Sequence, residues 1–293
     1  MKRPVIALLA LALSLALVLA GISLAAGEWL TRPVPAAIGA PPADLHAETV
    51  TLLYGDGQHL AGWFVPGRPG EGAVLLMHGV RGSRLQMLAR ARWLQREGMA
   101  SLLVDAPSHG ESSGGRIGFG RLEAPGAEAA LAWLRRRVPG EKVGAIGASL
   151  GGASLLFAQR QPELDALVLE SVYPTIVDAL QDRLAMRLGT TASQLLAPLL
   201  LVQIPLRLGL GTDQLRPVDA ITSVRAPLLV ASGIDDLHTR WPETEALFAA
   251  APEPKTLWAV PGAAHVDLHG FDAAAYDARI GPWLQSHLRK SPG

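Results

Sequence analysis

The segment from Gly147 to Gly151 reads Gly-Ala-Ser-Leu-Gly and matches the pattern G-x-S-x-G. It directly follows a short apolar run, residues 143–146, and precedes small and apolar residues that favour a helix. A serine on a sharp turn between a strand and a helix projects its hydroxyl above the sheet, where it can act as a nucleophile. A glycine-rich turn with a helix-capping serine is the alternative interpretation. The strand-turn-helix context favours Ser149 as the nucleophile.

Acyl transfer by a serine requires backbone N–H groups that point at the developing oxyanion. The residue after the nucleophile, Leu150, is the first predicted donor. The second is predicted in the loop 78–82, His-Gly-Val-Arg-Gly, where Val80 is the best-placed residue. A strand-to-helix turn with a structural histidine is the alternative. Arg81 in this loop could hold a substrate carboxylate, or it could be a solvated surface charge.

A serine nucleophile also needs a general base, and the chain contains eight histidines. Only His265 follows the last apolar run, residues 256–260, in a Pro-Gly-Ala-Ala turn before a final helix. We therefore expect His265 to be the base. His269, four residues further, is the alternative, and the other histidines are expected to be structural or exposed.

The base needs a carboxylate that orients its ring and stabilises its cation. The preceding apolar run, residues 227–231, is followed by Ser-Gly-Ile-Asp-Asp, so Asp235 and Asp236 are both candidates. Glu170, at the end of the run 166–169, is a third candidate because an acid there would also face the site.

The elements that must position these residues follow a regular alternation. Continuous apolar runs alternate with longer amphipathic stretches from residue 73 to the C-terminus, which is typical of a mostly parallel sheet covered by helices on both faces. Residues 48–54 and 59–65, separated by Gly-Asp-Gly, predict a β-hairpin before this sheet. Apolar, helical segments within 173–221 interrupt the alternation and predict a small helical cap.

The N-terminus predicts a membrane segment. Lys2 and Arg3 precede an uncharged stretch of residues 4–27, long enough to span a bilayer as a helix. We expect residues 1–27 to be an uncleaved anchor, with cleavage as a signal peptide as the alternative. The two N-terminal cations place the following chain on the outer side of the cell membrane. Residues 28–47 contain four prolines and predict an extended tether to a domain at 48–293.

Composition excludes several classes of function. The 26 basic and 26 acidic residues balance without a run of more than three like charges, which argues against nucleic acid as a partner. There is no cysteine, so disulfides, thiolate metal sites and a cysteine nucleophile are excluded. No H-E-x-x-H or comparable ligand spacing is present, so neither a metal nor a cofactor is predicted.

In this order, the motifs resemble the α/β-hydrolase superfamily, from about Glu48 to the C-terminus. The resemblance is greatest to the branch of monoacylglycerol lipases, small esterases and serine aminopeptidase-like hydrolases. The segment 105–112, Asp-Ala-Pro-Ser-His-Gly-Glu-Ser, is similar to that branch's D-x-R-G-H-G-x-S turn, although Pro107 replaces the arginine. Residues 233–236 match its G-x-x-D acid loop, and this resemblance implies Asp236 as the acid.

These features predict a serine hydrolase that cleaves a small or medium acyl ester, or a lipid-like one, through an acyl-enzyme. The catalytic residues are expected to be Ser149, Asp236 and His265. Peptide or amide cleavage by the same residues is the alternative. A non-catalytic binding protein of the same fold is an alternative of another class.

Overall fold

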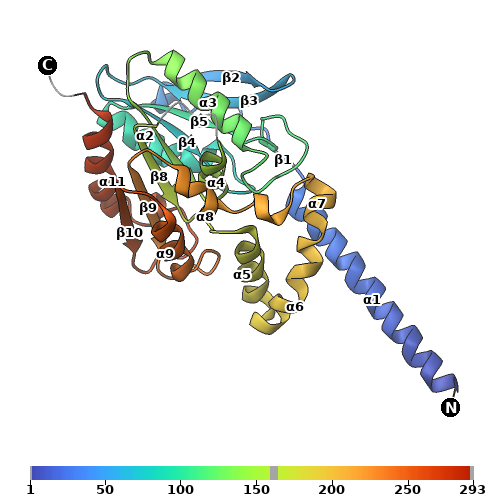
Figure 1. The fold of residues 1–293 in the computed structure, drawn as a ribbon. Helices are drawn as coiled ribbons and strands as arrows, with labels where there is room; N and C mark the ends of the chain where they lie inside the picture. Colours follow the sequence, from blue (N-terminus) through green and yellow to red (C-terminus); the bar gives the residue numbers. More distant parts are fainter. Residues whose placement is uncertain (1, 159–163, 291–293) are drawn as a thin grey trace.

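The computed structural model describes residues 2–158 and 164–290. Residue 1 of the predicted anchor and residues 159–163 and 291–293 of the predicted domain lie outside the described residues. An eight-stranded sheet of order β10-β9-β8-β7-β4-β5-β3-β2 forms the centre of the molecule (Figure 1). Only the β2–β3 and β3–β5 pairs are antiparallel. The mostly parallel sheet is therefore confirmed. Its strands are β2 (Glu48–Tyr54), β3 (Gln58–Val65), β4 (Ala73–Met77), β5 (Ala100–Val104), β7 (Val143–Ala148), β8 (Ala166–Glu170), β9 (Leu228–Gly233) and β10 (Lys255–Val260).

Helices cover both faces of the sheet, which explains its continuous apolar strands. Strand β4 is buried along its whole length. Its Leu75 and Met77 belong to one apolar core cluster, and Val74 and Leu76 to the other. The first cluster includes α3 (Ala124–Arg137), α4 (Leu150–Phe157) and α9 (Trp241–Ala250), and the second includes α2 (Leu88–Glu97), α10 (Leu268–Phe271) and α11 (Ala273–Leu288). Side chains that alternate between two buried faces leave no polar face on the strand.

The predicted hairpin and cap are both present. Strands β2 and β3 pair from Glu48↔Phe64 to Tyr54↔Gln58. The chain between β8 and β9 forms the cap, in which Ile176, Leu180, Leu200, Ile204 and Leu215 make a separate small apolar cluster. Its helices are α5 (Ile176–Leu188), α6 (Thr190–Leu201), α7 (Gln203–Leu208) and α8 (Pro217–Ala220).

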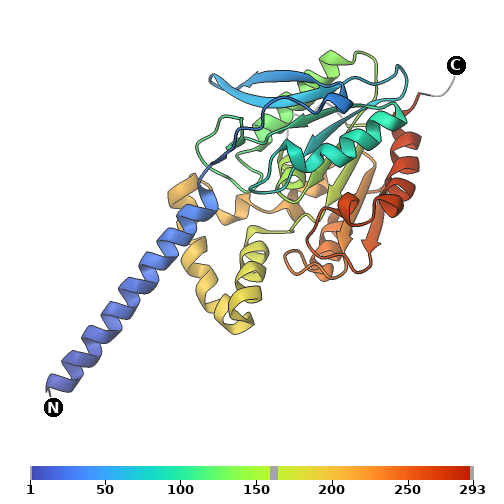
Figure 2. The same ribbon diagram turned by 180° about the vertical axis from the view of Figure 1, so that it is seen from behind.

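The N-terminal segment is one helix, α1 (Lys2–Thr31), which continues four residues beyond the predicted boundary at residue 27. Most of it projects away from the body, on the same side as α5 and α6 (Figures 1 and 2). By length and composition two helical stretches are sufficient to cross a membrane, Arg3–Thr31 and Thr190–Leu208, with mean hydropathies of 2.9 and 1.3. The first of these is the apolar segment noted in the sequence.

The proline-rich segment after α1 pairs with the domain. Strand β1 (Val34–Pro35) pairs in parallel with β6 (His109–Gly110). The amides of Val34 and Ala36 donate to the Ser108 and Gly110 carbonyls at 2.8 and 2.9 Å. Proline lacks an N–H, so the amides on either side of Pro35 form this pairing and hold the segment against the domain.

Candidate active site

Four loops meet where the parallel strands end. They follow β4, β7, β9 and β10, and they carry Val80, Ser149, Asp236 and His265 respectively. Because parallel strands place their carboxyl ends at one edge of a sheet, residues far apart in the chain converge there.

The Ser149 backbone has φ = 47° and ψ = −111°, a conformation that residues other than glycine rarely adopt. Two glycines permit this turn. A Cβ on Gly147 would lie 2.6 Å from the Gly152 Cα, and one on Gly151 would collide with the Met77 carbonyl oxygen. The close packing of β7 against α4 therefore requires glycine on both sides of the serine.

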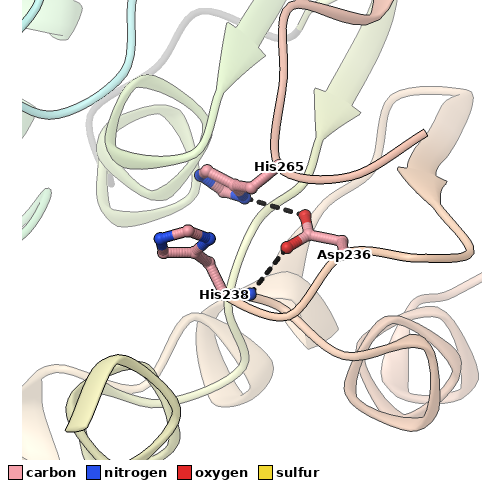
Figure 3. A group of neighbouring side chains, drawn as sticks. All are labelled: Asp236, His238 and His265. Carbon is pink, nitrogen blue, oxygen red and sulfur yellow. Dashed lines mark hydrogen bonds and ion pairs between the residues drawn. The ribbon is translucent and has the colours of Figure 1, made fainter. Parts of the chain in front are cut away.

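His265 and Asp236 form a hydrogen-bonded pair, with 2.7 Å between His265 Nδ1 and Asp236 Oδ2 (Figure 3). The other oxygen, Oδ1, accepts from the amides of His238 and Thr239 at 2.7 and 3.0 Å. Burial opposes ionisation of Asp236, but His265 and the two amides outweigh it and lower the pKa of this carboxyl. Within the described chain, neither the Ser149 hydroxyl nor His265 Nε2 forms a hydrogen bond, so both remain available to a substrate.

The alternative candidates lie elsewhere. Asp235 is exposed. Glu170 is buried in an ion pair with Arg90, at 2.5 Å, and accepts from the Tyr276 hydroxyl at 2.5 Å. His269 is buried against Trp93 and Tyr276 in the core cluster of α2 and α11. Of the three candidate acids, Asp236 is therefore the one that forms a hydrogen bond with His265.

The amides of Val80 and Leu150 have no hydrogen-bond acceptor among residues 2–158 and 164–290. Leu150 is the first residue of α4, where a helical N–H has no partner within the helix. The amides on either side of Val80 are occupied, since Gly79 donates to Gln86 and Arg81 donates to His109. Two unpaired N–H groups beside Ser149 suit an oxyanion.

Two histidines that the sequence suggested only as structural hold this loop. Ala106 N donates to His78 Nε2 at 2.9 Å, and Arg81 N donates to His109 Nε2 at 3.0 Å. Each Nδ1 therefore donates, to the carbonyls of Gly79 and Pro107 respectively. Burial lowers the pKa of His78 to about 3 and also lowers that of His109, so both rings stay neutral and keep these acceptors.

A cavity of about 740 Å³ opens above Ser149, a size suited to a small-molecule ligand. Most of its lining is apolar, including Phe119, Tyr173 and Leu180. His238 also lines it, with its ring 4.8 Å from that of His265 (Figure 3). The sequence did not single out His238, because nothing in its local pattern distinguishes it from an exposed histidine.

Asp236, His238 and His265 offer ligand atoms within 4.8 Å of one another, which raises the possibility of a metal site. The geometry favours a hydrogen-bonded pair instead. Two ligands of a tetrahedral zinc ion would be roughly 3.3 Å apart. The 2.7 Å between His265 Nδ1 and Asp236 Oδ2 is a hydrogen-bond distance, and Oδ1 is already occupied by two amides.

This chain is similar to a known protein family and to several solved structures. Residues 68–217 match the family described as serine aminopeptidase, S33. The uncharacterized protein Rv2307c of Mycobacterium tuberculosis is 33% identical over 241 residues, covering 80% of this chain and 77% of that protein. The esterase Pf2001 of Pyrococcus furiosus superposes with a TM-score of 0.71 at 21% identity, covering 88% of this chain and 98% of the esterase. A dienelactone hydrolase of Anabaena variabilis gives a TM-score of 0.60 at 24% identity, covering 83% and 99%.

The fold is therefore that of the α/β hydrolases, as the sequence motifs predicted. The chain belongs to the S33 serine aminopeptidase-like family and is a hydrolytic enzyme.

Proposed function

We propose that this enzyme is a serine carboxylic ester hydrolase. Ser149 Oγ attacks the ester carbonyl while His265 Nε2 takes its proton, and Asp236 stabilises the resulting imidazolium. The Val80 and Leu150 amides stabilise the oxyanion. The imidazolium then protonates the departing alkoxide, and water activated by the same nitrogen hydrolyses the acyl-enzyme. The observation that carries the proposal is the convergence of a strained serine turn, two unpaired amides and a carboxylate–histidine pair at one sheet edge.

The cavity supports an ester rather than an aminopeptide substrate. An aminopeptidase must neutralise the ammonium group of its substrate, which calls for a carboxylate close to the nucleophile. No aspartate or glutamate is among the described residues that line the cavity, whereas Arg81, Arg183 and Arg187 are. An amine would meet only like charges there.

The test combines a covalent probe with substrates. A fluorophosphonate should label the wild-type enzyme and leave Ser149→Ala unlabelled, because it requires an activated serine. p-Nitrophenyl esters of increasing chain length should be hydrolysed faster than aminoacyl p-nitroanilides. Undiminished labelling of the Ser149→Ala variant would show that Ser149 is not the nucleophile. Faster cleavage of the anilides would show that the enzyme is a peptidase.

We further propose that α1 anchors the enzyme in the cell membrane with its catalytic domain on the outer side. Lys2 and Arg3 precede the apolar stretch, which favours this orientation. Leu195 and Leu206 are exposed on cap helices that contact α1, so the apolar surface continues onto the cap. The enzyme should stay with the membrane in alkaline carbonate. Release of a soluble mature form would instead indicate a cleaved signal peptide.

A further inference from the structure

Among the described residues, one arginine of the cavity lacks a carboxylate partner although it is partly shielded from solvent. Arg183 of α5 lines the cavity together with Ser149. Its NH1 donates to the Ala179 carbonyl at 2.7 Å. Within the described part of the chain, no carboxylate lies within ion-pair distance of its guanidinium. The neighbouring acid, Asp182, is bound by Arg240 at 2.6 Å.

Arg183 is half-buried, and it differs from the two fully buried arginines of the described chain, which have carboxylate partners. Arg84 binds Asp105, and Arg90 binds Glu170. An arginine surrounded by apolar groups loses hydration that it regains only by binding an anion or several acceptors. Burial accordingly lowers the pKa of Arg183.

We propose that Arg183 binds an anionic group of the substrate, so that the preferred substrates are esters combining an apolar chain with a carboxylate or a phosphate. This proposal rests on the ester hydrolase function above. The apolar walls from Ile176, Leu180 and Leu184 would hold the chain, and a guanidinium can bind either anion through two parallel hydrogen bonds. Arg187, one turn further along α5, adds a second positive charge to the lining.

The test uses two pairs of substrates, and the members of each pair differ by one anionic group. The p-nitrophenyl monoester of octanedioic acid is compared with p-nitrophenyl octanoate, and mono-octanoylglycerol 3-phosphate with mono-octanoylglycerol. The first pair places a carboxylate on the acyl chain, and the second places a phosphate on the alcohol. We expect wild-type kcat/KM to be higher for the anionic member of at least one pair, which also identifies the source of the anion.

Arg183→Gln should reduce kcat/KM for the preferred anionic ester by about 10- to 100-fold and for the neutral ester by a clearly smaller factor, so that the anionic preference is lost. Arg183→Lys should retain part of the preference because it keeps the charge. Arg136→Gln is the matched control, since Arg136 is exposed on α3 outside the cavity. Equal rates for charged and neutral esters, or a preference that survives in Arg183→Gln, would overturn the anion site. Absence of all ester hydrolysis by the wild type would overturn the proposed function itself.

A separate observation concerns the end of α1, which is packed into the domain. Ser23 Oγ donates to the Leu199 carbonyl at 2.9 Å, and Gln203 Nε2 donates to Ser23 Oγ at 2.8 Å. Glu28 forms ion pairs with Arg116 and Arg207, at 2.7 and 2.5 Å. These contacts join α1 to the cap and to the loop before α3.

Trp29 links α1 to the oxyanion loop. The Arg81 guanidinium carbon lies 4.2 Å from the centre of the Trp29 ring, and NH1 donates to the Trp29 carbonyl at 2.9 Å. Arg81 has a left-handed backbone, φ = 60°, and directly follows Val80. Trp29 and Leu30 also line the cavity above Ser149.

We infer that the end of α1 is part of the active site, with Trp29 as a positioning residue that holds the oxyanion loop through Arg81. The active form of the enzyme therefore retains α1. Removal of the chain up to residue 27 would detach the pocket-lining Trp29 and Leu30 from the helix that presents them.

The test uses the full chain in detergent. Trp29→Ala should lower kcat for a short neutral ester about 10-fold or more with a smaller change in KM, because the oxyanion amide acts mainly in the transition state. Trp29→Phe should restore most of kcat, since a ring remains over Arg81. The effects of Trp29→Ala and Arg81→Gln should be non-additive in the double variant. Leu13→Ala, on the exposed part of α1, is the control.

Three results would overturn this inference. The first is additive effects in the double variant, and the second is an unchanged kcat in Trp29→Ala. The third is a purified mature enzyme whose intact mass places its first residue after 27 and whose kcat equals that of the full chain. An enzyme that still labels with fluorophosphonate in any of these cases would leave the ester hydrolase function intact.

Discussion

Asp236→Asn tests the proposed catalytic residues most directly, because the exchange keeps the size of the side chain and removes its charge. In the wild type both oxygens accept hydrogen bonds. Oδ1 accepts from the amides of His238 and Thr239, and Oδ2 accepts from His265 Nδ1. An asparagine has one acceptor oxygen, and the two amides require it. Its NH₂ group must then face His265 Nδ1, which becomes an acceptor. The imidazole proton moves to Nε2, the atom that has to take the proton from Ser149.

The expected loss combines this wrong tautomer with the missing charge opposite the imidazolium. A thousand- to ten-thousandfold fall in kcat corresponds to about 4–5.5 kcal/mol of transition-state free energy. KM should change little, because Asp236 is buried and does not line the cavity. The unfolding free energy should change less than kcat, since the amides keep their acceptor.

The assay measures kcat with a p-nitrophenyl ester, together with ¹⁵N chemical shifts of the His265 ring, which report the tautomer. Asp235→Asn is the matched control, because Asp235 is exposed one residue away, and it should stay within about threefold of the wild type. A kcat within tenfold of the wild type for Asp236→Asn, or an unchanged tautomer, would refute the reasoning. A larger loss for Asp235→Asn would assign the acid to that residue.

Two further predictions concern carboxylates outside this pair. Glu170→Gln should lower the unfolding free energy by about 1–3 kcal/mol in urea titrations, because it removes one of the two carboxylates that bind the buried Arg90 guanidinium and leaves Asp267 as the other. The folded fraction should still label with fluorophosphonate, and a stable but unlabelled variant would make Glu170 the catalytic acid. Burial raises the pKa of Glu123 from 4.5 to about 7. The native state therefore binds more protons than the unfolded state between these pH values, and the contribution of Glu123 to stability falls as pH rises through this window, by on the order of 3 kcal/mol. Glu123→Gln should flatten that part of the stability profile, and an identical slope in both proteins would contradict the assignment.

The strands were predictable because each is an uninterrupted apolar run bounded by turn residues. The predicted runs 143–146, 166–169 and 256–260 lie within β7, β8 and β10, since strands buried on both faces need no polar alternation. The sequence motif likewise predicted the turn around Ser149, because only small residues fit beside it. The choice of Asp236 over Asp235 came from a resemblance and not from local pattern, and the hydrogen bond to His265 now gives a physical reason to favour it.

Other features depend on contacts between segments far apart in the chain, which no local pattern contains. The pairing of β1 with β6 joins residues more than 70 positions apart, and the proline-rich composition of residues 28–47 predicted an extended tether without showing where it pairs. The contact between Trp29 and Arg81 spans 52 positions. Arg81 was predicted to be a surface charge or a substrate ligand, because the sequence does not show that the end of α1 lies beside the loop.

The elements that form the walls of the cavity differ from those that carry the reacting groups. The substrate preference can therefore change while the catalytic reaction stays the same. The reacting groups lie on loops at the ends of β7, β9 and β10, where the parallel sheet fixes their positions. The cavity walls come largely from α1 and α5, which lie outside that sheet. Replacing Leu180 or Leu184 of α5 by a larger or smaller apolar residue should therefore shift the preferred acyl length, measured as the ratio of kcat/KM for two p-nitrophenyl esters. The rate of fluorophosphonate labelling should stay near the wild-type value, because the hydrogen bond between Asp236 and His265 does not involve α5. A parallel loss of labelling would show that the cap positions the catalytic groups as well as the substrate.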